Sequence, residues 1–568
     1  MRIPFMKRDR DRGQDRGRDQ DRGQDQDRGR DQGQGRGPAR RRGVGRSVLA
    51  LGCGALPALA FPAPGLWWWA YLALVPWLLL IRTAPGARRA ALDGWLGGAG
   101  FVLAVHHWLL PSLHVFLLPL AALLGLLWLP WGWLVRSVLG GTPSPPRAAV
   151  ALLAVPSGWL LIEMVRSWEG LGGPWGLLGA SQWEVPVALR LASVGGVWLV
   201  SLLVVAVNTA VALLLTAPGP RAVGVAGLAA CALVAGSAAW GVGAPRESGT
   251  VRVALVQPGV FEGPDGAERR FARAEELTRS LAGQPLDLVV WGESGVGTDP
   301  AGRPELAARL TALARAVDAP LLVNVDARRS DRPGIYKSAV LVAPTGLTGQ
   351  RYDKMRLVPF GEYVPARAAL GWVTSVGKAA QEDRRRGTTP VVMTLPAAGG
   401  VAAGAVQGLR VGPLICFESA FPDMSRRLVR DGAGLLVVQS ATSTFQESWA
   451  PAQHASLAAL RAAETGRPVA HATLTGISAA YGPDGRRIGP VLGTEASAVA
   501  VRELPLSATT TLYVRWGDWP LYGALAVVGA VCAAEGAGVL GRPGSPLRRS
   551  GPRPGSGPRG PRARTARG

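Results

Sequence analysis

The 568-residue sequence is poor in the side chains that bind metal ions, with only four cysteines and five histidines. Three of the cysteines, Cys53, Cys231 and Cys532, lie within apolar stretches, so Cys416 is alone in the more polar part of the chain. One thiol cannot form an internal disulfide, and one thiol with two scattered histidines matches no zinc-binding spacing. The sequence therefore predicts neither a disulfide framework nor a metal site.

Acidic residues are missing from the end of the chain. Residues 542–568 carry eight arginines and no acidic residue, and the formal net charge of the whole chain is +23. Arg40, Arg41, Arg42 and Arg46 precede the first apolar stretch. Basic residues beside membrane spans mark the cytoplasmic side, so this charge indicates membrane topology rather than nucleic-acid binding. The low-complexity arm, residues 1–46, and the tail, 542–568, are predicted to be disordered.

Apolar stretches and tryptophan, in contrast, are abundant. The sequence is 48% hydrophobic and has 20 tryptophans, which membrane proteins place at the water–lipid interface. An eighth span is predicted at 518–541, after seven spans within 47–242. Those seven lie near 47–61, 65–81, 92–110, 114–135, 148–165, 191–216 and 222–241. A cleaved signal peptide is the alternative for the first stretch, because it is short and contains Pro57.

The charges between the spans predict their orientation. Arginines follow the even-numbered spans, whereas the loops after the first and third spans carry no charge. Because basic loops stay in the cytoplasm, both termini are expected there. Residues 250–505, inserted between the seventh and eighth spans, are then expected on the extracytoplasmic face.

This insert, 250–505, has the pattern of an α/β domain. Short runs that are apolar on both faces predict strands at 251–256, 286–291, 320–325, 338–343, 410–415, 434–439, 468–473 and 497–501. Helical spacing is found at 266–283, 305–317 and 451–465. The alternation predicts sheets that are covered by helices.

Three candidate catalytic residues, Glu293, Lys354 and Cys416, follow strands or strand-like runs. Each alone has an ordinary explanation, as a surface carboxylate, a solvated lysine and a buried thiol. Together they supply a nucleophile, a base that removes its proton and a cation that stabilises an oxyanion. His454 and His471 are the alternative partners for Cys416, although neither lies in a recognisable motif.

The segments that contain these residues are similar to those of a known superfamily. The similar stretches include 173–182, 355–365 and 461–468. They resemble the nitrilase, or carbon–nitrogen hydrolase, superfamily, and together with eight spans they resemble its membrane branch, the apolipoprotein N-acyltransferases. The resemblance implies an α-β-β-α sandwich, a catalytic triad of Glu293, Lys354 and Cys416, and supporting roles for Trp175, Glu362, Phe417, Glu418 and Phe445. One departure is Thr444, where the family has tryptophan.

The resemblance also implies an activity in the bacterial cell membrane. A fatty acyl chain would pass from a membrane phospholipid, through a thioester on Cys416, to the α-amino group of the N-terminal S-diacylglyceryl-cysteine of a lipoprotein. This is the last step of lipoprotein maturation, and it implies no metal, no dissociable cofactor and no nucleic-acid partner. Two alternatives are a membrane-tethered amidase and a non-catalytic scaffold for a polyprenol-phosphate-mannose synthase. An amidase needs only one anchoring helix, and a scaffold needs no complete triad.

Overall fold

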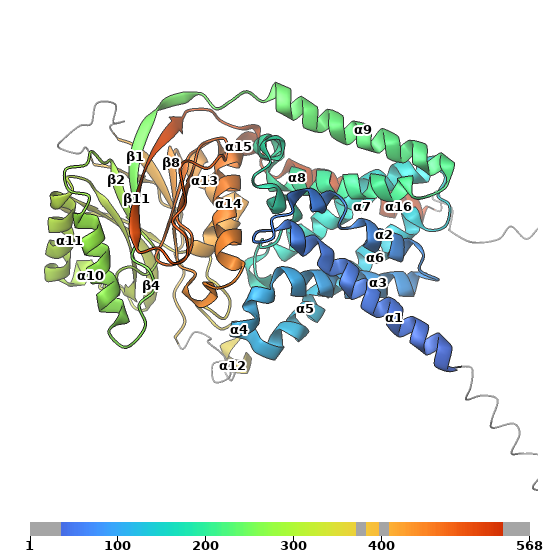
Figure 1. Ribbon diagram of the computed structural model, residues 1–568, viewed down its shortest axis with the longest axis horizontal. Helices are drawn as coiled ribbons and strands as arrows, with labels where there is room; N and C mark the ends of the chain where they lie inside the picture. Colours follow the sequence, from blue (N-terminus) through green and yellow to red (C-terminus); the bar gives the residue numbers. More distant parts are fainter. Residues whose placement is uncertain (1–35, 371–381, 397–407, 538–568) are drawn as a thin grey trace, which may run out of the picture.

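The computed structural model describes residues 36–370, 382–396 and 408–537, and it has two parts that lie side by side (Figure 1). One part is helical, and the other is a sandwich of two sheets. The helical part contains α1 (Arg36–Ala55), α2 (Val75–Arg82), α3 (Ala87–Val105), α4 (Leu110–Leu113), α5 (Leu117–Gly125), α6 (Leu129–Leu139), α7 (Pro145–Arg166), α8 (Pro186–Leu214), α9 (Pro218–Gly241), α15 (Leu512–Trp516) and α16 (Trp519–Gly536).

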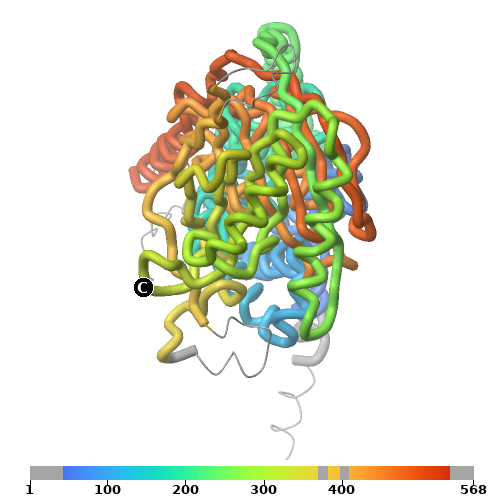
Figure 2. The backbone as a smooth tube through the Cα atoms, turned by 90° about the vertical axis from the view of Figure 1, so that its left-hand side faces the viewer, coloured from blue at the N-terminus to red at the C-terminus, as the bar shows by residue number. Residues whose placement is uncertain are grey.

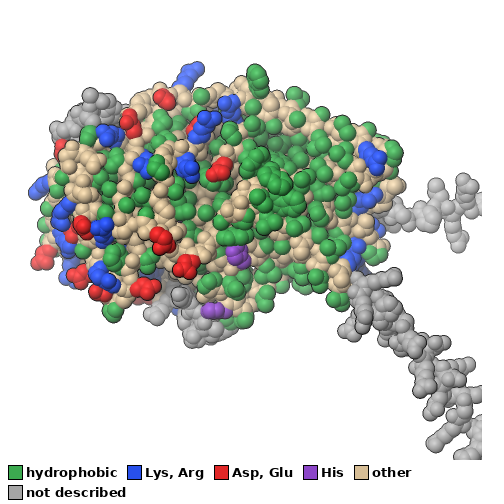
Figure 3. Space-filling view, in the orientation of Figure 1, with side chains coloured by type: hydrophobic (Ala, Val, Ile, Leu, Met, Phe, Trp, Pro, Cys, Tyr) green, Lys and Arg blue, Asp and Glu red, His purple; other side chains and the backbone are tan. Residues whose placement is uncertain are grey.

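Among the described residues, six helical stretches are long and apolar enough to cross a membrane by length and composition: Gly43–Ala60, His107–Leu139, Pro145–Arg166, Pro186–Leu214, Pro218–Gly241 and Trp519–Gly536. The other two predicted spans fall on Trp67–Arg82, which is shorter, and on α3, which carries Arg88, Arg89 and Asp93. The count of eight therefore stays a prediction. Hydrophobic side chains dominate the surface of the helical part, whereas charged side chains gather over the sandwich (Figure 3).

The first helix begins earlier than the sequence predicted. Residues up to 46 were expected to be disordered, but α1 begins at Arg36. Adding a residue to an existing helix costs little free energy, and arginine is a good helix former. The helix of the apolar stretch therefore extends back into the arginines that precede it. Residues 1–35 and the C-terminal tail, 538–568, lie outside the described residues.

The sandwich contains a six-stranded sheet in the order β11-β1-β2-β3-β4-β5 and a five-stranded sheet in the order β10-β9-β8-β7-β6. All eight predicted strands correspond to strands of the structure, and β5, β6 and β10 were not predicted. The strands are β1 (Glu247–Gln257), β2 (Leu288–Trp291), β3 (Leu321–Arg328), β4 (Ile335–Ala343), β5 (Gly346–Asp353), β6 (Met393–Thr394), β7 (Arg410–Ile415), β8 (Leu435–Ser440), β9 (Val469–Thr473), β10 (Ala479–Tyr481) and β11 (Ala498–Ser507).

Three apolar layers confirm the predicted α-β-β-α order. One core fills the space between the two sheets, and a second packs α10 (Gly266–Arg279) and α11 (Pro304–Ala316) on the outer face of the six-stranded sheet. The third joins the membrane helices to α13 (Pro422–Arg430) and α14 (Ala450–Thr465), which cover the other sheet. Figure 2 looks onto the sandwich, with the membrane helices behind it. The helix layer of the second sheet is therefore also the contact with the helical part.

Glycines let α1 and α3 approach closely, which generates a stability prediction. A Cβ at Gly54 would lie 1.9 Å from the Gly97 carbonyl oxygen, whereas a Cβ at Gly52, on the same helix, has nothing within 4 Å. We expect Gly54→Ala to destabilise the protein by about 1–3 kcal/mol, because two backbones must separate. Gly52→Ala is the matched control and should be neutral or stabilising. Thermal unfolding of the purified proteins in detergent measures both, and equal midpoints would contradict this packing.

Candidate active site

The candidate catalytic residues meet where strands of both sheets end. The Glu293 backbone N–H, just after β2, donates to the Ser440 carbonyl oxygen at the end of β8 (3.1 Å). The buried Gln439 side-chain amide donates to the Trp291 carbonyl oxygen at 2.9 Å. These bonds hold the ends of the two sheets together. Cys416, which follows β7, and Lys354, which follows β5, are displayed at the same place by their strands.

Four charged side chains form a buried cluster here. The Lys354 ammonium lies 3.1 Å from Glu293 Oε1 and 2.7 Å from Glu362 Oε1. A second lysine, Lys337 on β4, lies 2.8 Å and 3.1 Å from the same two atoms. Burial alone would raise the pKa of the Glu293 carboxyl, but the two lysines lower it to about 2. Glu293 is therefore an ionised carboxylate at neutral pH, as a general base must be.

Cys416 lies beside this cluster with a strained backbone. Its φ of 52° is in the left-handed region, which a residue with a side chain adopts at a cost and mostly at functional sites. Its thiol donates to the Ala441 carbonyl oxygen at 3.9 Å and is near enough to the Glu293 carboxylate for the two groups to shift each other's pKa. Burial and the negative charge of Glu293 raise the pKa of the thiol to about 12. At neutral pH the Cys416 side chain is thus a thiol rather than a thiolate.

Glu418 connects the segment of Lys354 to the segment of Cys416. One of its oxygens accepts from the Tyr352 hydroxyl at 2.6 Å and from the Met355 N–H at 2.7 Å. The other accepts from the Ile415 N–H at 2.8 Å. Both segments are thereby held by one buried carboxylate.

The histidines are near Cys416 but do not bind its sulfur. His454 Nδ1 lies 2.9 Å from the Ser440 hydroxyl, and that hydroxyl lies 3.7 Å from Cys416 Sγ. His454 Nε2 is 3.0 Å from the Cys416 carbonyl oxygen, and His471 packs against the His454 ring. Burial lowers the pKa of His454 to about 4, so its ring is neutral. Within the described ranges, no three His, Cys, Asp or Glu side chains are grouped so as to hold a metal ion.

Aromatic side chains from both parts of the protein surround the site. Trp108, between α3 and α4, lies 5.1 Å from Trp175 and 4.8 Å from Phe445, measured between ring centroids. Trp175 also contacts the His454 ring at 5.7 Å, and its indole N–H donates to a buried glutamine. Phe417 packs edge-on against a second phenylalanine of the same turn. The site thus has an apolar wall that the helical part helps to build.

All eight residues that the sequence singled out lie in this region, but two polar ones that share it were missed. Lys337 lies in the run Tyr-Lys-Ser, which has no recognisable signal, and only the pairing of β4 with β5 places it beside Lys354. Tyr352 lies in β5, and nothing in the sequence around it distinguishes it from an ordinary strand residue. Thr444, at the departure from the family pattern, is exposed.

Two family descriptions match this chain. The carbon-nitrogen hydrolases match residues 252–513, and the apolipoprotein N-acyltransferase N-terminal domain matches residues 53–210. Among solved structures, an amidase from Nesterenkonia sp. is 19% identical and covers 49% of this chain and 98% of its own, with a TM-score of 0.33.

Relatives of the full length are also found. The apolipoprotein N-acyltransferase of Azotobacter vinelandii is 33% identical over 505 residues, which cover 84% of this chain and 92% of the relative. That of Gloeobacter violaceus is 31% identical over 528 residues, 87% and 95% of the two chains. The matches extend through both the helical part and the sandwich. The chain belongs to the apolipoprotein N-acyltransferase family.

Proposed function

We propose that Cys416 carries the acyl group in a two-step transfer, with Glu293 as its base and Lys354 as the oxyanion-stabilising cation. Family membership makes the chain an acyltransferase of lipoprotein maturation. The observation that carries the residue assignment is the proximity of one thiol to an ionised carboxylate that two buried lysines hold. This arrangement supplies each group that acyl transfer through a thioester requires.

In the first step, Glu293 takes the thiol proton while the sulfur of Cys416 attacks the ester carbonyl carbon of a phospholipid. The ammonium of Lys354 stabilises the tetrahedral oxyanion. The ester C–O bond then breaks, Glu293 returns the proton to the leaving oxygen, and a lysophospholipid departs. A thioester on Cys416 remains.

In the second step, the α-amino group of a diacylglyceryl-cysteine attacks the thioester carbonyl. Glu293 receives a proton from the amine, the C–S bond breaks, and the proton returns to the sulfur. The product is an amide, which is more stable than a thioester, so the transfer proceeds forward. The aromatic wall of Trp108, Trp175 and Phe445 supports this assignment, because both substrates are lipids and acyl chains need an apolar surface.

Lys337 completes the charge balance of the site in this proposal. With Lys354 alone, Glu293 and Glu362 would leave one uncompensated negative charge in a buried place, which is costly. Lys337 contacts both carboxylates and neutralises the cluster. We assign it a positioning role, in which it keeps Glu293 ionised.

The sandwich, residues 250–505, is proposed to lie on the extracytoplasmic face, between the membrane helices of 47–242 and the last span, 518–541. The distribution of arginines supports this orientation. A reporter that is active only outside the cytoplasm should be active when fused near Gly249 and silent after Arg542. The opposite pair of results would reverse the orientation.

The acyl-enzyme generates a direct prediction. Wild-type protein treated with phospholipid alone should gain one acyl mass on the peptide that contains Cys416, and hydroxylamine should remove it. Cys416→Ala should gain none, whereas Ser419→Ala, a neighbouring hydroxyl on the same turn, should still be acylated. Mass spectrometry of the digested protein measures this. An acyl mass on Ser419 or Ser440 would show that the nucleophile is assigned wrongly.

The role of Lys337 is tested by a pH profile. In Lys337→Met the pKa of Glu293 should rise, because one of the cations that lower it is lost. The base then becomes protonated at higher pH, so the acid limb of single-turnover acylation should move up by about 2 pH units or more. Arg309→Gln is the matched control, since Arg309 of α11 pairs with Glu275 of α10 and not with Glu293. A merely structural Lys337 would lower the unfolding temperature and leave the profile unchanged.

A further inference from the structure

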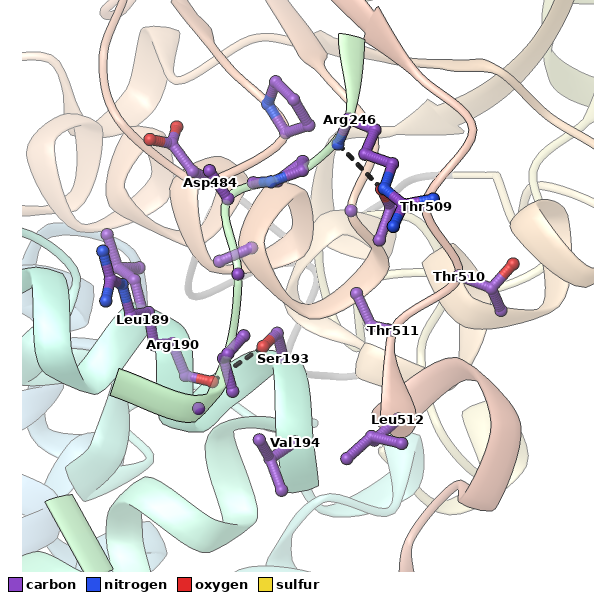
Figure 4. Close-up of a pocket in the computed structure, with 18 of the residues that line it drawn as sticks. Leu189, Arg190, Ser193, Val194, Arg246, Asp484, Thr509, Thr510, Thr511 and Leu512 are labelled. Carbon is purple, nitrogen blue, oxygen red and sulfur yellow. Dashed lines mark hydrogen bonds between the residues drawn. The ribbon is translucent and has the colours of Figure 1, made fainter. Parts of the chain in front are cut away.

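A cavity of about 700 Å³ lies at the junction of the helical part and the sandwich. Figure 4 shows Arg190, Ser193 and Val194 of α8 on one side and Thr511 and Leu512 on the other. Its lining also includes segment 241–246, which leads from α9 to β1, and segment 508–512, which leads from β11 to α15. Both connections between the two parts of the protein therefore run along this cavity. The residues of the candidate active site are not part of its lining.

The lining carries four arginines and one acidic residue. Arg190 comes from α8, Arg246 from the first connection, Arg486 from the sandwich and Arg515 from α15. Arg486 pairs with the acidic residue, Asp484, at 3.5 Å, and the Arg190 guanidinium reaches a backbone carbonyl oxygen at the end of α9. The guanidinium groups of Arg246 and Arg515 have neither a hydrogen bond nor an ion pair within the part of the chain that the structure describes. The cavity thus has donors and positive charge for an anion.

Exposed tryptophans place this cavity near the surface of the bilayer. Trp240, at the end of the apolar helix α9, is 93% exposed, and Trp516, next to Arg515, is 61% exposed. Tryptophans whose rings are exposed at the ends of membrane spans lie at the level of the lipid headgroups. The anion that is most concentrated at this level is the phosphate of phospholipids. Arginine binds phosphate well, because its planar fork of N–H donors matches two phosphate oxygens.

We propose that this cavity binds the phosphate-bearing headgroup of an anionic membrane phospholipid, which ties the sandwich to the membrane helices. Arg190 and Arg515 belong to the helical part, Arg486 belongs to the sandwich, and Arg246 lies on the segment that connects the two. One headgroup in the cavity would therefore contact both parts. This site is separate from Cys416 and holds an intact lipid as a ligand. The proposal does not depend on the acyl-transfer mechanism, which the acylation of Cys416 tests independently.

The test compares lipids bound by the full-length protein. Purified protein is placed in phosphatidylcholine nanodiscs with or without phosphatidylglycerol, and thermal unfolding and native mass spectrometry follow. Wild type should retain phosphatidylglycerol in preference to phosphatidylcholine and should unfold at a higher temperature with it. Arg246→Gln with Arg515→Gln should weaken the apparent affinity for phosphatidylglycerol on the order of tenfold, since two cations beside the phosphate are lost.

The matched control is Arg279→Gln with Arg328→Gln, which removes two exposed arginines from the six-stranded sheet and its helix layer. It should bind phosphatidylglycerol as wild type does. If the first pair unfolds early even in phosphatidylcholine, Arg190→Gln with Arg486→Gln provides the same measurement on the other side of the cavity. Equal retention of both lipids by wild type, or equal losses in the cavity and control pairs, would overturn the proposal.

Inorganic phosphate distinguishes a lipid from a soluble ligand. Added to wild type, phosphate should displace bound phosphatidylglycerol, because both present the same oxygens to the arginines. Stabilisation by phosphate without any stabilisation by phosphatidylglycerol would assign the cavity to a soluble anion and refute the lipid.

Discussion

The buried pairing of Glu293 and Glu362 with Lys337 and Lys354 is the interaction on which the site depends. A charge taken out of water is costly unless it is paired, so the four groups are stable there only together. Both carboxylates and both lysines come from the six-stranded sheet and its loops, whereas the thiol comes from the other sheet. The distance between the sheets therefore determines how closely Glu293 approaches Cys416. Gln439, which spans the sheets, fixes that distance.

The helical part holds the same machinery from the other side. Helix α14 carries His454 and packs on α8, and Glu464 near its end accepts a hydrogen bond from the Val197 N–H at 2.8 Å. This bond satisfies a backbone group next to Gly196, where α8 departs from helical geometry. In the loop after α7, Glu169 pairs with Arg356, two residues after Lys354. The membrane helices thus act as more than an anchor, because they contact the segments that position the candidate catalytic groups.

The sequence predicted what depends on local pattern. Short apolar runs identified eight of the strands, and the ends of two of them identified Glu293 and Cys416 as candidates, whereas β5, which precedes Lys354, was not predicted. Lys337 was not predictable, because its place beside Lys354 follows from strand register, which the sequence of one strand does not contain. The wall of Trp108 and Trp175 joins segments that are distant in the chain. The number of spans stayed open where charge interrupts an apolar pattern, as at Asp93 in α3, where two arginines pair with the buried carboxylate.

The exposed Thr444 shows which part of the site tolerates change. It stands where the family has tryptophan, in the turn that also contains Phe445. Phe445 packs on Trp108, so the turn remains attached to the helical part through one aromatic side chain. In the charged cluster, in contrast, each lysine pairs with both glutamates, so the loss of any one side chain affects two ion pairs. An apolar wall can lose one ring and keep most of its contact area, whereas a buried ion-pair cluster that loses one charge leaves another unpaired. Substitutions are therefore expected to be tolerated better in the aromatic wall than among the charged side chains beside Cys416.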